Sequence, residues 1–191
     1  MEEFLKVDFS KFEGTEYSAD ETLSAEMFDI LNKSDSFYME ARPYGSDSLM
    51  KMVISDEKIM VGGTDADEYG VSKIVVEGEK AYVVIDEEKT VLVASSEGLE
   101  EITEFSEITT GRINFDASTY VVSEITIEGE KYYVEAIDNS DDLCMLYDEG
   151  KKLHLFIVDR SAYHFLITDE IPEGAFDIPS DYEKIDMTDM E

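Results

Sequence analysis

Residues 69–86 read YGVSKIVVEGEKAYVVID, and residues 120–137 read YVVSEITIEGEKYYVEAI. Both stretches are runs of β-branched and aromatic residues that are interrupted by the same four residues, Glu-Gly-Glu-Lys. Such side chains favour strands, and a short break containing glycine between two of them is typical of a β-hairpin. The repeat therefore predicts two copies of one hairpin in a chain that is built largely from antiparallel strands.

Similar runs, separated by clusters of Gly, Asp and Asn, continue through the chain from residue 37 onward. The predicted strands are residues 37–42, 49–55, 58–61, 71–77, 81–86, 90–95, 119–127, 131–137, 143–147, 152–159 and 162–168. Pro172 and Pro179 exclude a central strand near the C-terminal end, because proline cannot donate to a sheet ladder. The sequence thus predicts about eleven short strands.

Two stretches change from strand alternation to a helical period. Ser18 and Glu21 have the spacing of a capping box, and apolar residues then recur every three or four positions, which predicts an amphipathic helix over residues 19–32. Apolar residues at helical spacing predict a second helix within residues 98–108. The expected fold is α+β but mostly β: a strongly curved antiparallel sheet, or half-barrel, whose concave face is covered by two helices.

The charge balance excludes several classes of partner. The 191 residues include 47 acidic and 15 basic side chains, which give a formal net charge of −32. A field of this sign repels nucleic acid and anionic membrane surfaces. The lone cysteine, Cys144, lies in an apolar run and forms no internal disulfide, and we interpret it as a buried thiol. No integral membrane segment or leader peptide is visible, although a leader could have been removed from the N-terminal end.

The order of these features resembles the LolA/LolB/LppX-like lipoprotein carrier superfamily. The resemblance lies in the helix over residues 19–32, the segment KAYVVID at residues 80–86, the helix between the repeat copies and the closing segment PEGAFDIPSDY at residues 172–182. It implies an unclosed barrel with a helical lid over an apolar cavity. It divides the chain into an arm (residues 1–17), a half-barrel domain (residues 18–185) and a tail (residues 186–191). It also implies a bacterial protein that works outside the cytoplasm or on the cell surface.

Methionine is the first candidate for a ligand-binding role, because its flexible and polarisable side chain suits varied apolar ligands. The predicted cavity-lining residues are Met27, Met39, Met50, Met52 and Met60. Met50 and Met52 are expected to share one face of a strand, since strand side chains alternate with a period of two. The alternative interpretation is that these methionines simply fill the core.

Three acidic clusters, at residues 65–68, 86–88 and 138–142, carry oxygen ligands of the kind that Ca²⁺ prefers. The third cluster has Leu143 where a helix-loop-helix calcium site needs glycine, and no glutamate closes it. All three clusters lie at strand ends, so we interpret them as solvated turns, with weak calcium binding as the alternative. His154 and His164 are expected on adjacent strands, where a carboxylate at Asp159 or Asp169 could join them. Their spacing supplies no third ligand, and no metal site, cofactor or catalytic residue is predicted.

The remaining candidates are a serine and three arginines. Ser161 has no nucleophile elbow around it, so acyl transfer is unsupported. Arg42, Arg112 and Arg160 could each hold a lipid headgroup or an acidic partner, or else pair with one of the many carboxylates of the chain.

The leading functional hypothesis is a non-enzymatic binding protein, an exported or cell-surface carrier that encloses a lipid acyl chain or a similar apolar small molecule. The alternative is a structural or interaction module of the cell surface that contacts a protein partner and has no small-molecule ligand. The two differ in where apolar surface lies, because a carrier hides it in a pocket whereas an interaction module exposes it as a patch.

Overall fold

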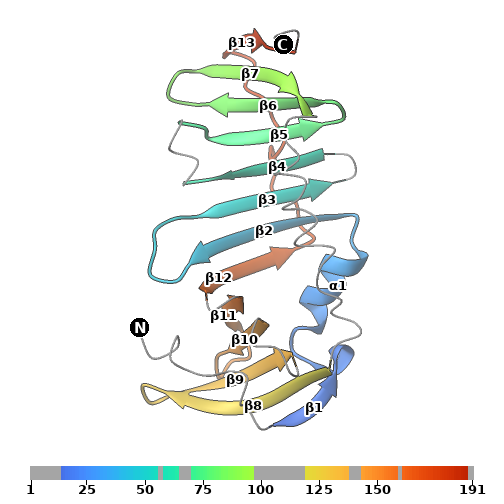
Figure 1. The fold of residues 1–191 in the computed structure, drawn as a ribbon, viewed down its shortest axis with the longest axis vertical. Coiled ribbons are helices and arrows are strands. Elements are labelled where there is room, and N and C mark those ends of the chain that lie inside the picture. The colour runs from blue at the N-terminus through green and yellow to red at the C-terminus, as the bar shows by residue number, and fades with distance from the viewer. Residues whose placement is uncertain are drawn as a thin grey trace.

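A computed structural model describes residues 14–55, 58–64, 70–96, 119–137, 143–158 and 161–188. Within these residues the chain forms one large, unclosed and curved sheet of 13 strands (Figure 1). Across the sheet the strands follow the order β1-β8-β9-β10-β11-β12-β2-β3-β4-β5-β6-β7-β13. Their bounds are β1 Thr15–Ser18, β2 Ser36–Pro43, β3 Met50–Ser55, β4 Lys58–Gly63, β5 Lys73–Glu77, β6 Lys80–Ile85, β7 Thr90–Ser95, β8 Thr119–Ile127, β9 Glu130–Ile137, β10 Leu143–Tyr147, β11 Leu153–Val158, β12 Ser161–Thr168 and β13 Glu183–Asp186.

The strands β2 to β12 correspond to the eleven predicted from the sequence, and β1 and β13 are additional. The strand β1 forms within the predicted N-terminal arm and pairs with β8. The strand β13 pairs with β7 in parallel, so the sheet is mixed and the expectation of a purely antiparallel sheet is wrong at this edge. Both added strands are short and largely exposed, and each depends on a partner more than 80 residues away in the sequence.

The sheet consists of two meanders that are joined at one seam. The strands β2 to β7 form the first meander and β8 to β12 the second, and the antiparallel pair β12–β2 joins them. The N-terminal strand β1 occupies the outer edge of the second meander, whereas the C-terminal strand β13 occupies the outer edge of the first. Each end of the chain therefore completes the half of the sheet that the opposite part of the chain builds.

The two repeat copies form the hairpins β5–β6 and β8–β9, as predicted, but their turns differ. The first copy turns at residues 78–79 and the second at residues 128–129, which is one residue earlier in the repeated sequence. The φ angle is +58° at Gly78 in the first turn, and it is +52° at Glu128 and +90° at Gly129 in the second. One positive φ followed by a negative one is typical of a type II′ turn, and two positive values of a type I′ turn.

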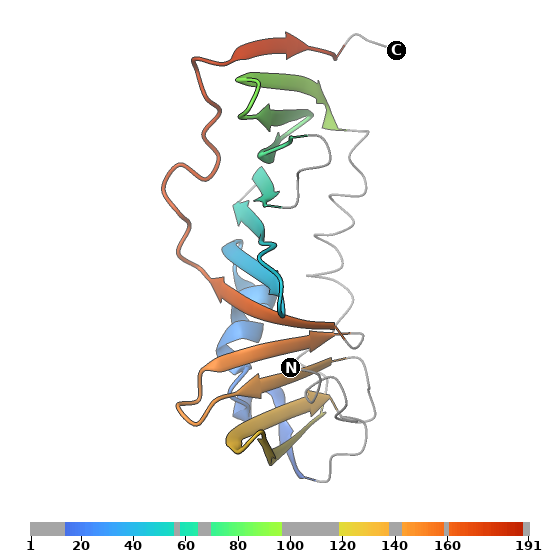
Figure 2. The ribbon, with the colours of Figure 1, turned by 90° about the vertical axis from the view of Figure 1, so that its left-hand side faces the viewer.

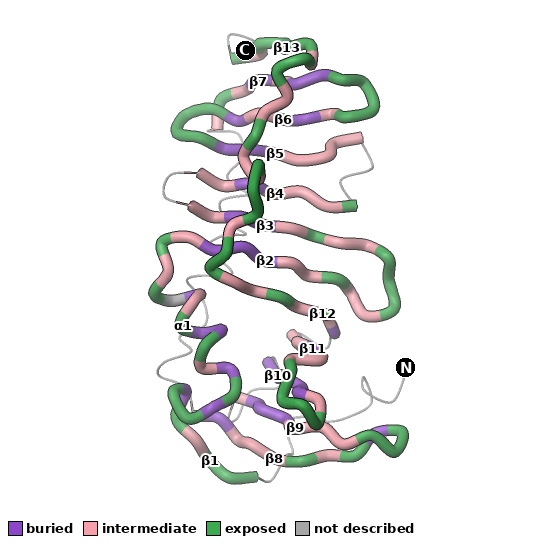
Figure 3. The backbone as a smooth tube through the Cα atoms, turned by 180° about the vertical axis from the view of Figure 1, so that it is seen from behind, coloured by how far each residue is buried: buried purple, intermediate pink, exposed green. Residues whose placement is uncertain are grey.

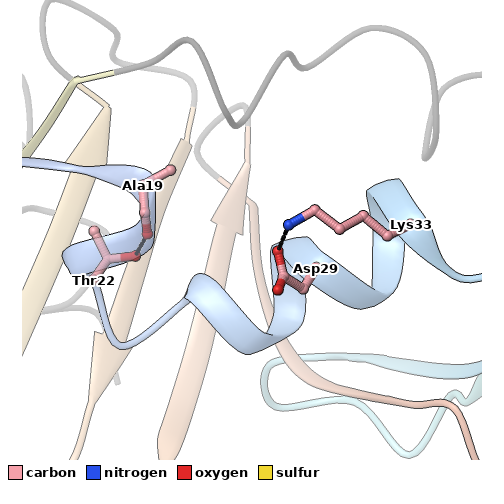
Figure 4. Close-up of polar contacts among 4 residues, drawn as sticks. All are labelled: Ala19, Thr22, Asp29 and Lys33. Atoms are coloured by element: carbon pink, nitrogen blue, oxygen red, sulfur yellow. Dashed lines mark hydrogen bonds and ion pairs between the residues drawn. The ribbon is translucent and has the colours of Figure 1, made fainter.

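The predicted N-terminal helix is shorter than expected and begins later. Residues Ala19–Glu21 form a single 3₁₀ turn, and the helix α1 spans Ala25–Lys33. The break falls at Thr22, whose backbone is extended and whose hydroxyl donates to the carbonyl oxygen of Ala19 at 2.7 Å (Figure 4). The capping box is present, with Ser18 N donating to Glu21 Oε2 at 3.2 Å, but it caps the 3₁₀ turn. The predicted helix over residues 98–108 lies outside the described residues.

The helix α1 packs into the curve of the sheet. The ring of Phe28 on α1 lies 5.4 Å from the ring of Tyr120 on β8, and α1 also contacts β12. Because β8 and β12 are separated by three strands in the sheet order, the sheet must bend around the helix. Met27 and Leu31 of α1 join a core that includes Met39 on β2. We call this side of the sheet the helix face.

Over the first meander, the opposite side of the sheet is covered by residues 169–182, which we call the strap. The strap runs from β12 to β13 along one side of the sheet (Figure 2) and crosses the strands from β2 toward β7 (Figure 3). Its apolar side chains, among them Phe176 and Ile178, pack on Tyr38, Val53 and Met60. This strap face is thus a second hydrophobic layer that the sequence analysis did not predict.

Candidate functional site

A groove opens between α1 and the strands β10 to β12, at the curved part of the sheet. Its volume is about 280 Å³. Eleven residues line it: Leu23, Glu26, Met27, Ile30, Tyr147, Leu153, Phe165, Leu166, Ile167, Thr168 and Asp169. Eight of these are apolar or aromatic, so the groove is a candidate site for an apolar ligand.

The local sequence explains how the two walls form. Leu23, Met27 and Ile30 recur at helical spacing, so they lie along one side of α1 and the segment before it. On the strand side, Phe165 stacks on the ring of Phe156 at 4.9 Å between centroids, which fixes its orientation. Leu166 is 50% exposed, and strand alternation directs its side chain to the face of β12 that carries His164, away from Phe165.

A buried carboxylate holds the helix wall in place. Glu135 on β9 is only 1% exposed, and its two oxygens accept hydrogen bonds from Leu23 N at 2.5 Å and from Ser24 N at 3.0 Å. The hydroxyl of Ser24 also donates to Glu135 Oε2 at 2.6 Å. Because that proton points to Glu135, the Tyr147 hydroxyl, 2.5 Å from Ser24 Oγ, donates to Ser24. Leu23 and Tyr147 both line the groove, so this cluster ties the helix wall to the strands.

The carboxylate also supplies what the start of a helix needs. The first N–H groups of a helix have no partner within it, and they carry partial positive charge that favours an anion. Burial nevertheless raises the pKa of Glu135 above its usual value of 4.5, while the hydrogen bonds from Ser24 and Leu23 act to lower it. Burial likewise raises the pKa of the Tyr147 hydroxyl. The phenol therefore stays protonated and remains a donor at neutral pH.

The structure brings three of the five predicted cavity methionines into one region. Met27 lines the groove, and Met39 and Met52 lie behind it in the core of the helix face. Met50 stands exposed at the start of β3. Met60 lies on the other side of the sheet, in the core beneath the strap, so the structure does not bring it to the groove.

Sequence reasoning missed the polar cluster of Glu135, Ser24 and Tyr147. One signal was present, because Glu135 stands in the second repeat copy where Val84 stands in the first. An acidic residue that replaces an apolar one within an otherwise apolar repeat indicates a specific partner, since an unpaired buried charge is costly.

His154 and His164 lie near each other on the strap face, with ring centroids 5.8 Å apart. His164 Nδ1 lies 3.1 Å from the carbonyl oxygen of His154, and the rings of Tyr44 and Tyr132 flank the pair. Burial lowers the pKa of His154. Of the two carboxylates considered as partners, Asp159 is outside the described residues and Asp169 lines the groove. In the described part of the chain no group of three His, Cys, Asp or Glu could hold a metal ion.

The other candidates are placed as follows. Cys144 is a buried free thiol whose pKa is raised by burial. Asp86, in the second acidic cluster, accepts a hydrogen bond from the strap hydroxyl of Tyr182 at 2.9 Å. Arg42 on β2 and Ser161 on β12 are exposed. The two other acidic clusters and the two other arginines lie outside the described residues, namely residues 65–68 and 138–142, Arg112 and Arg160.

No family model and no curated protein matches this sequence. Among solved structures, the chain is similar to an uncharacterized conserved protein from Thermus thermophilus, with 8% identity and a TM-score of 0.39 over 86% of this chain and 99% of that one. It is also similar to a LolA superfamily protein from Nitrosomonas europaea, with 13% identity and a TM-score of 0.28 over 84% and 97% of the two chains. A DUF1329 family protein from Desulfovibrio piger matches with 13% identity and a TM-score of 0.28 over 81% and 94%.

Among the described residues, no helix combines the length and apolar character needed to cross a membrane.

Proposed function

We propose that this protein is a non-enzymatic binding protein that holds the apolar chain of a small ligand in the groove between α1 and the strands β10 to β12. The observation that carries the proposal is the groove itself, an open depression lined mainly by apolar side chains. Ligand pockets have this character, with a few polar groups that set the orientation of the ligand.

Part of the exposed apolar surface lies in the groove. Leu23, at 36% exposure, is one of the four large apolar side chains that are exposed in the described residues, and it lines the groove. When a ligand covers apolar groups that are open to water in a concave site, the free energy falls, and this favours binding. At about 280 Å³ the groove lies just below the range for small-molecule pockets, which starts at about 300 Å³. It suits one alkyl chain better than a lipid with two chains.

The Glu135 cluster supports binding by keeping the groove formed without a ligand. Because the hydrogen bonds of Leu23 and Ser24 fix the start of α1 on β9, the helix wall does not have to be ordered when a ligand arrives. A preformed site of this kind loses less conformational entropy on binding. The sequence resemblance supports a place outside the cytoplasm for such a carrier.

A pair of matched substitutions tests the proposal. Leu23→Asp places a charge in the groove, whereas Ile185→Asp places one at a similarly exposed apolar position on β13, outside the groove lining. Binding of 1-dodecanol is measured by displacement of an uncharged, environment-sensitive fluorophore. We expect the wild type and Ile185→Asp to bind alike and Leu23→Asp to bind at least about tenfold more weakly, because desolvating a charge opposes burial of the chain.

Absence of binding by the wild type would overturn the proposal. So would equal binding by the two variants, since the alcohol would then sit elsewhere. In the first case, an interaction surface for a protein partner becomes the better interpretation of the exposed Leu23 and Leu166 side chains.

A further inference from the structure

The charges around the groove bear on the class of ligand that it takes. Among the described residues that line it, the charged side chains are Glu26 on α1 and Asp169 at the start of the strap, and both are acidic. The described part of this lining contains neither lysine nor arginine. Both carboxylates are exposed, whereas Met27 and Tyr147 deeper in the groove are buried. The groove therefore has an apolar floor and an anionic rim.

This arrangement sets the direction of a bound amphiphile. Binding of an alkyl chain on the floor is favourable, because the chain displaces water from apolar side chains. The headgroup then lies at the rim, within the field of the two carboxylates and of a chain whose net charge is −32. A carboxylate or phosphate headgroup is repelled there, while an ammonium or guanidinium headgroup is attracted.

We propose that the ligand of the groove is a single-chain amphiphile with a cationic headgroup, and that Glu26 and Asp169 select it against anionic amphiphiles such as free fatty acids. The inference rests on the proposed function, because it requires that the groove bind apolar chains at all. It adds the chemical class of the headgroup and the two residues that recognise it.

The test compares three probes with the same chain length: dodecylamine, 1-dodecanol and dodecanoate. Each is kept below its critical micelle concentration at physiological ionic strength, and affinity is measured by displacement of the uncharged fluorophore. Exposed ion pairs contribute modestly, so we expect the amine to bind roughly tenfold more tightly than the carboxylate, with the alcohol between them. Raising the salt concentration should shrink this difference, because exposed charges are screened.

Matched double variants separate the rim from the field of the whole protein. Glu26→Gln with Asp169→Asn removes both rim charges. Asp29→Asn with Glu170→Gln removes two carboxylates from the same helix and from the residue next to Asp169, and neither of these residues lines the groove. Asp29 is paired with Lys33 at 2.5 Å (Figure 4), a contact that is exposed and of little consequence for stability. We expect the rim variant to lose the preference for the amine and the control variant to keep most of it.

The outcomes separate the two proposals. If dodecanol binds but the amine binds no better than the carboxylate, the headgroup inference is overturned and the apolar-chain function stands. If the control variant loses the preference as fully as the rim variant does, the selection belongs to the general field and the assignment to Glu26 and Asp169 is overturned. If none of the three probes binds, the proposed function itself fails, and the inference with it.

Discussion

Val84 and Glu135 occupy the same position in the two copies of the repeated hairpin, and both are buried, but by different means. Val84 on β6 lies in an apolar cluster with Val91 and Val93, against the strap residues Ile178 and Tyr182. Glu135 on β9 lies beneath the start of α1 and accepts hydrogen bonds from it. A similar local sequence thus serves as an apolar layer at one end of the sheet and as a helix anchor at the other.

The difference extends to the face of the sheet. Following the paired residues from strand to strand places Glu135 on the helix face with Met39, whereas Val84 lies on the strap face. Equivalent residues therefore point to opposite sides of one sheet. The comparison teaches that the repeat specifies a hairpin, while the segment packed on the hairpin decides what each position must be.

The largest loss of stability is expected for Val84→Glu, which places the residue of the second repeat copy at the equivalent position of the first. The carboxylate would enter an apolar cluster that offers no helix start to receive it, and an uncompensated buried charge costs about 3–5 kcal/mol. We expect the free energy of unfolding, measured by urea denaturation, to fall by that amount. Ile85→Glu, at the next and only half-buried position, is the control and should cost less. A loss below about 1 kcal/mol for Val84→Glu would show that the strap moves aside easily.

The reciprocal change, Glu135→Val, should cost about 2–3 kcal/mol. It leaves two backbone N–H groups and the Ser24 hydroxyl without their acceptor, and part of that cost is offset because a desolvated charge is removed. Amide hydrogen exchange at Leu23 and Ser24 should accelerate, and dodecanol binding should weaken because Leu23 lines the groove. Glu130→Gln, at an exposed position on the same strand, should change neither measurement. Unchanged exchange at Leu23 would contradict the anchoring role of Glu135.

The strap can be weakened separately with Phe176→Ala. Phe176 is half-buried in the core beneath the strap, so we expect a loss of about 1–2 kcal/mol in the free energy of unfolding. Dodecanol affinity should remain at the wild-type value, because the groove lies on the other side of the sheet. A fall in dodecanol affinity that accompanies the loss of stability would mean that the strap and the groove are coupled.

The smallest expected effect is a dependence of the unfolding free energy on pH. It arises from the Glu135 carboxyl, whereas the equivalent residue Val84 has no titratable group. The pKa of Glu135 in the folded protein is raised above 4.5, so the folded state holds this proton more tightly than the unfolded state does. Its contribution to stability is therefore fully present below pH 4.5 and is lost as the pH rises through the raised pKa. The difference in unfolding free energy between the wild type and Glu135→Gln should accordingly decrease from acidic to neutral pH. A difference that stays constant or increases would contradict the raised pKa.

Local features of the sequence could be predicted, and those that depend on distant partners could not. The eleven strands β2 to β12 follow from alternation and turn residues that lie within a few positions of one another. The late start of α1 could not be read locally, because Leu23 and Ser24 satisfy their N–H groups with Glu135, more than 110 residues away. The same holds for β1 and β13, whose partners lie in the opposite part of the chain.

The candidate site shows the same division between local and distant information. The helical spacing that brings Leu23, Met27 and Ile30 together was visible in the sequence. The opposite wall was not, because it depends on where β12 lies relative to α1. Met60 illustrates the limit of composition alone, since methionines of the same character fill the cores on both faces of the sheet.

The strand β1 borders the second meander and β13 borders the first, and this arrangement has a consequence for folding during synthesis on the ribosome. When the first meander has emerged, the strand that will cover its outer edge has not been translated, and neither has the strand β12 that will cover the other edge. The first half of the sheet consequently has two open edges until β12 emerges and one open edge until β13 emerges, and open edges invite pairing with other chains. Synthesis of this protein thus creates a period of vulnerability, in which a chaperone that shields strand edges would raise the yield of the native fold.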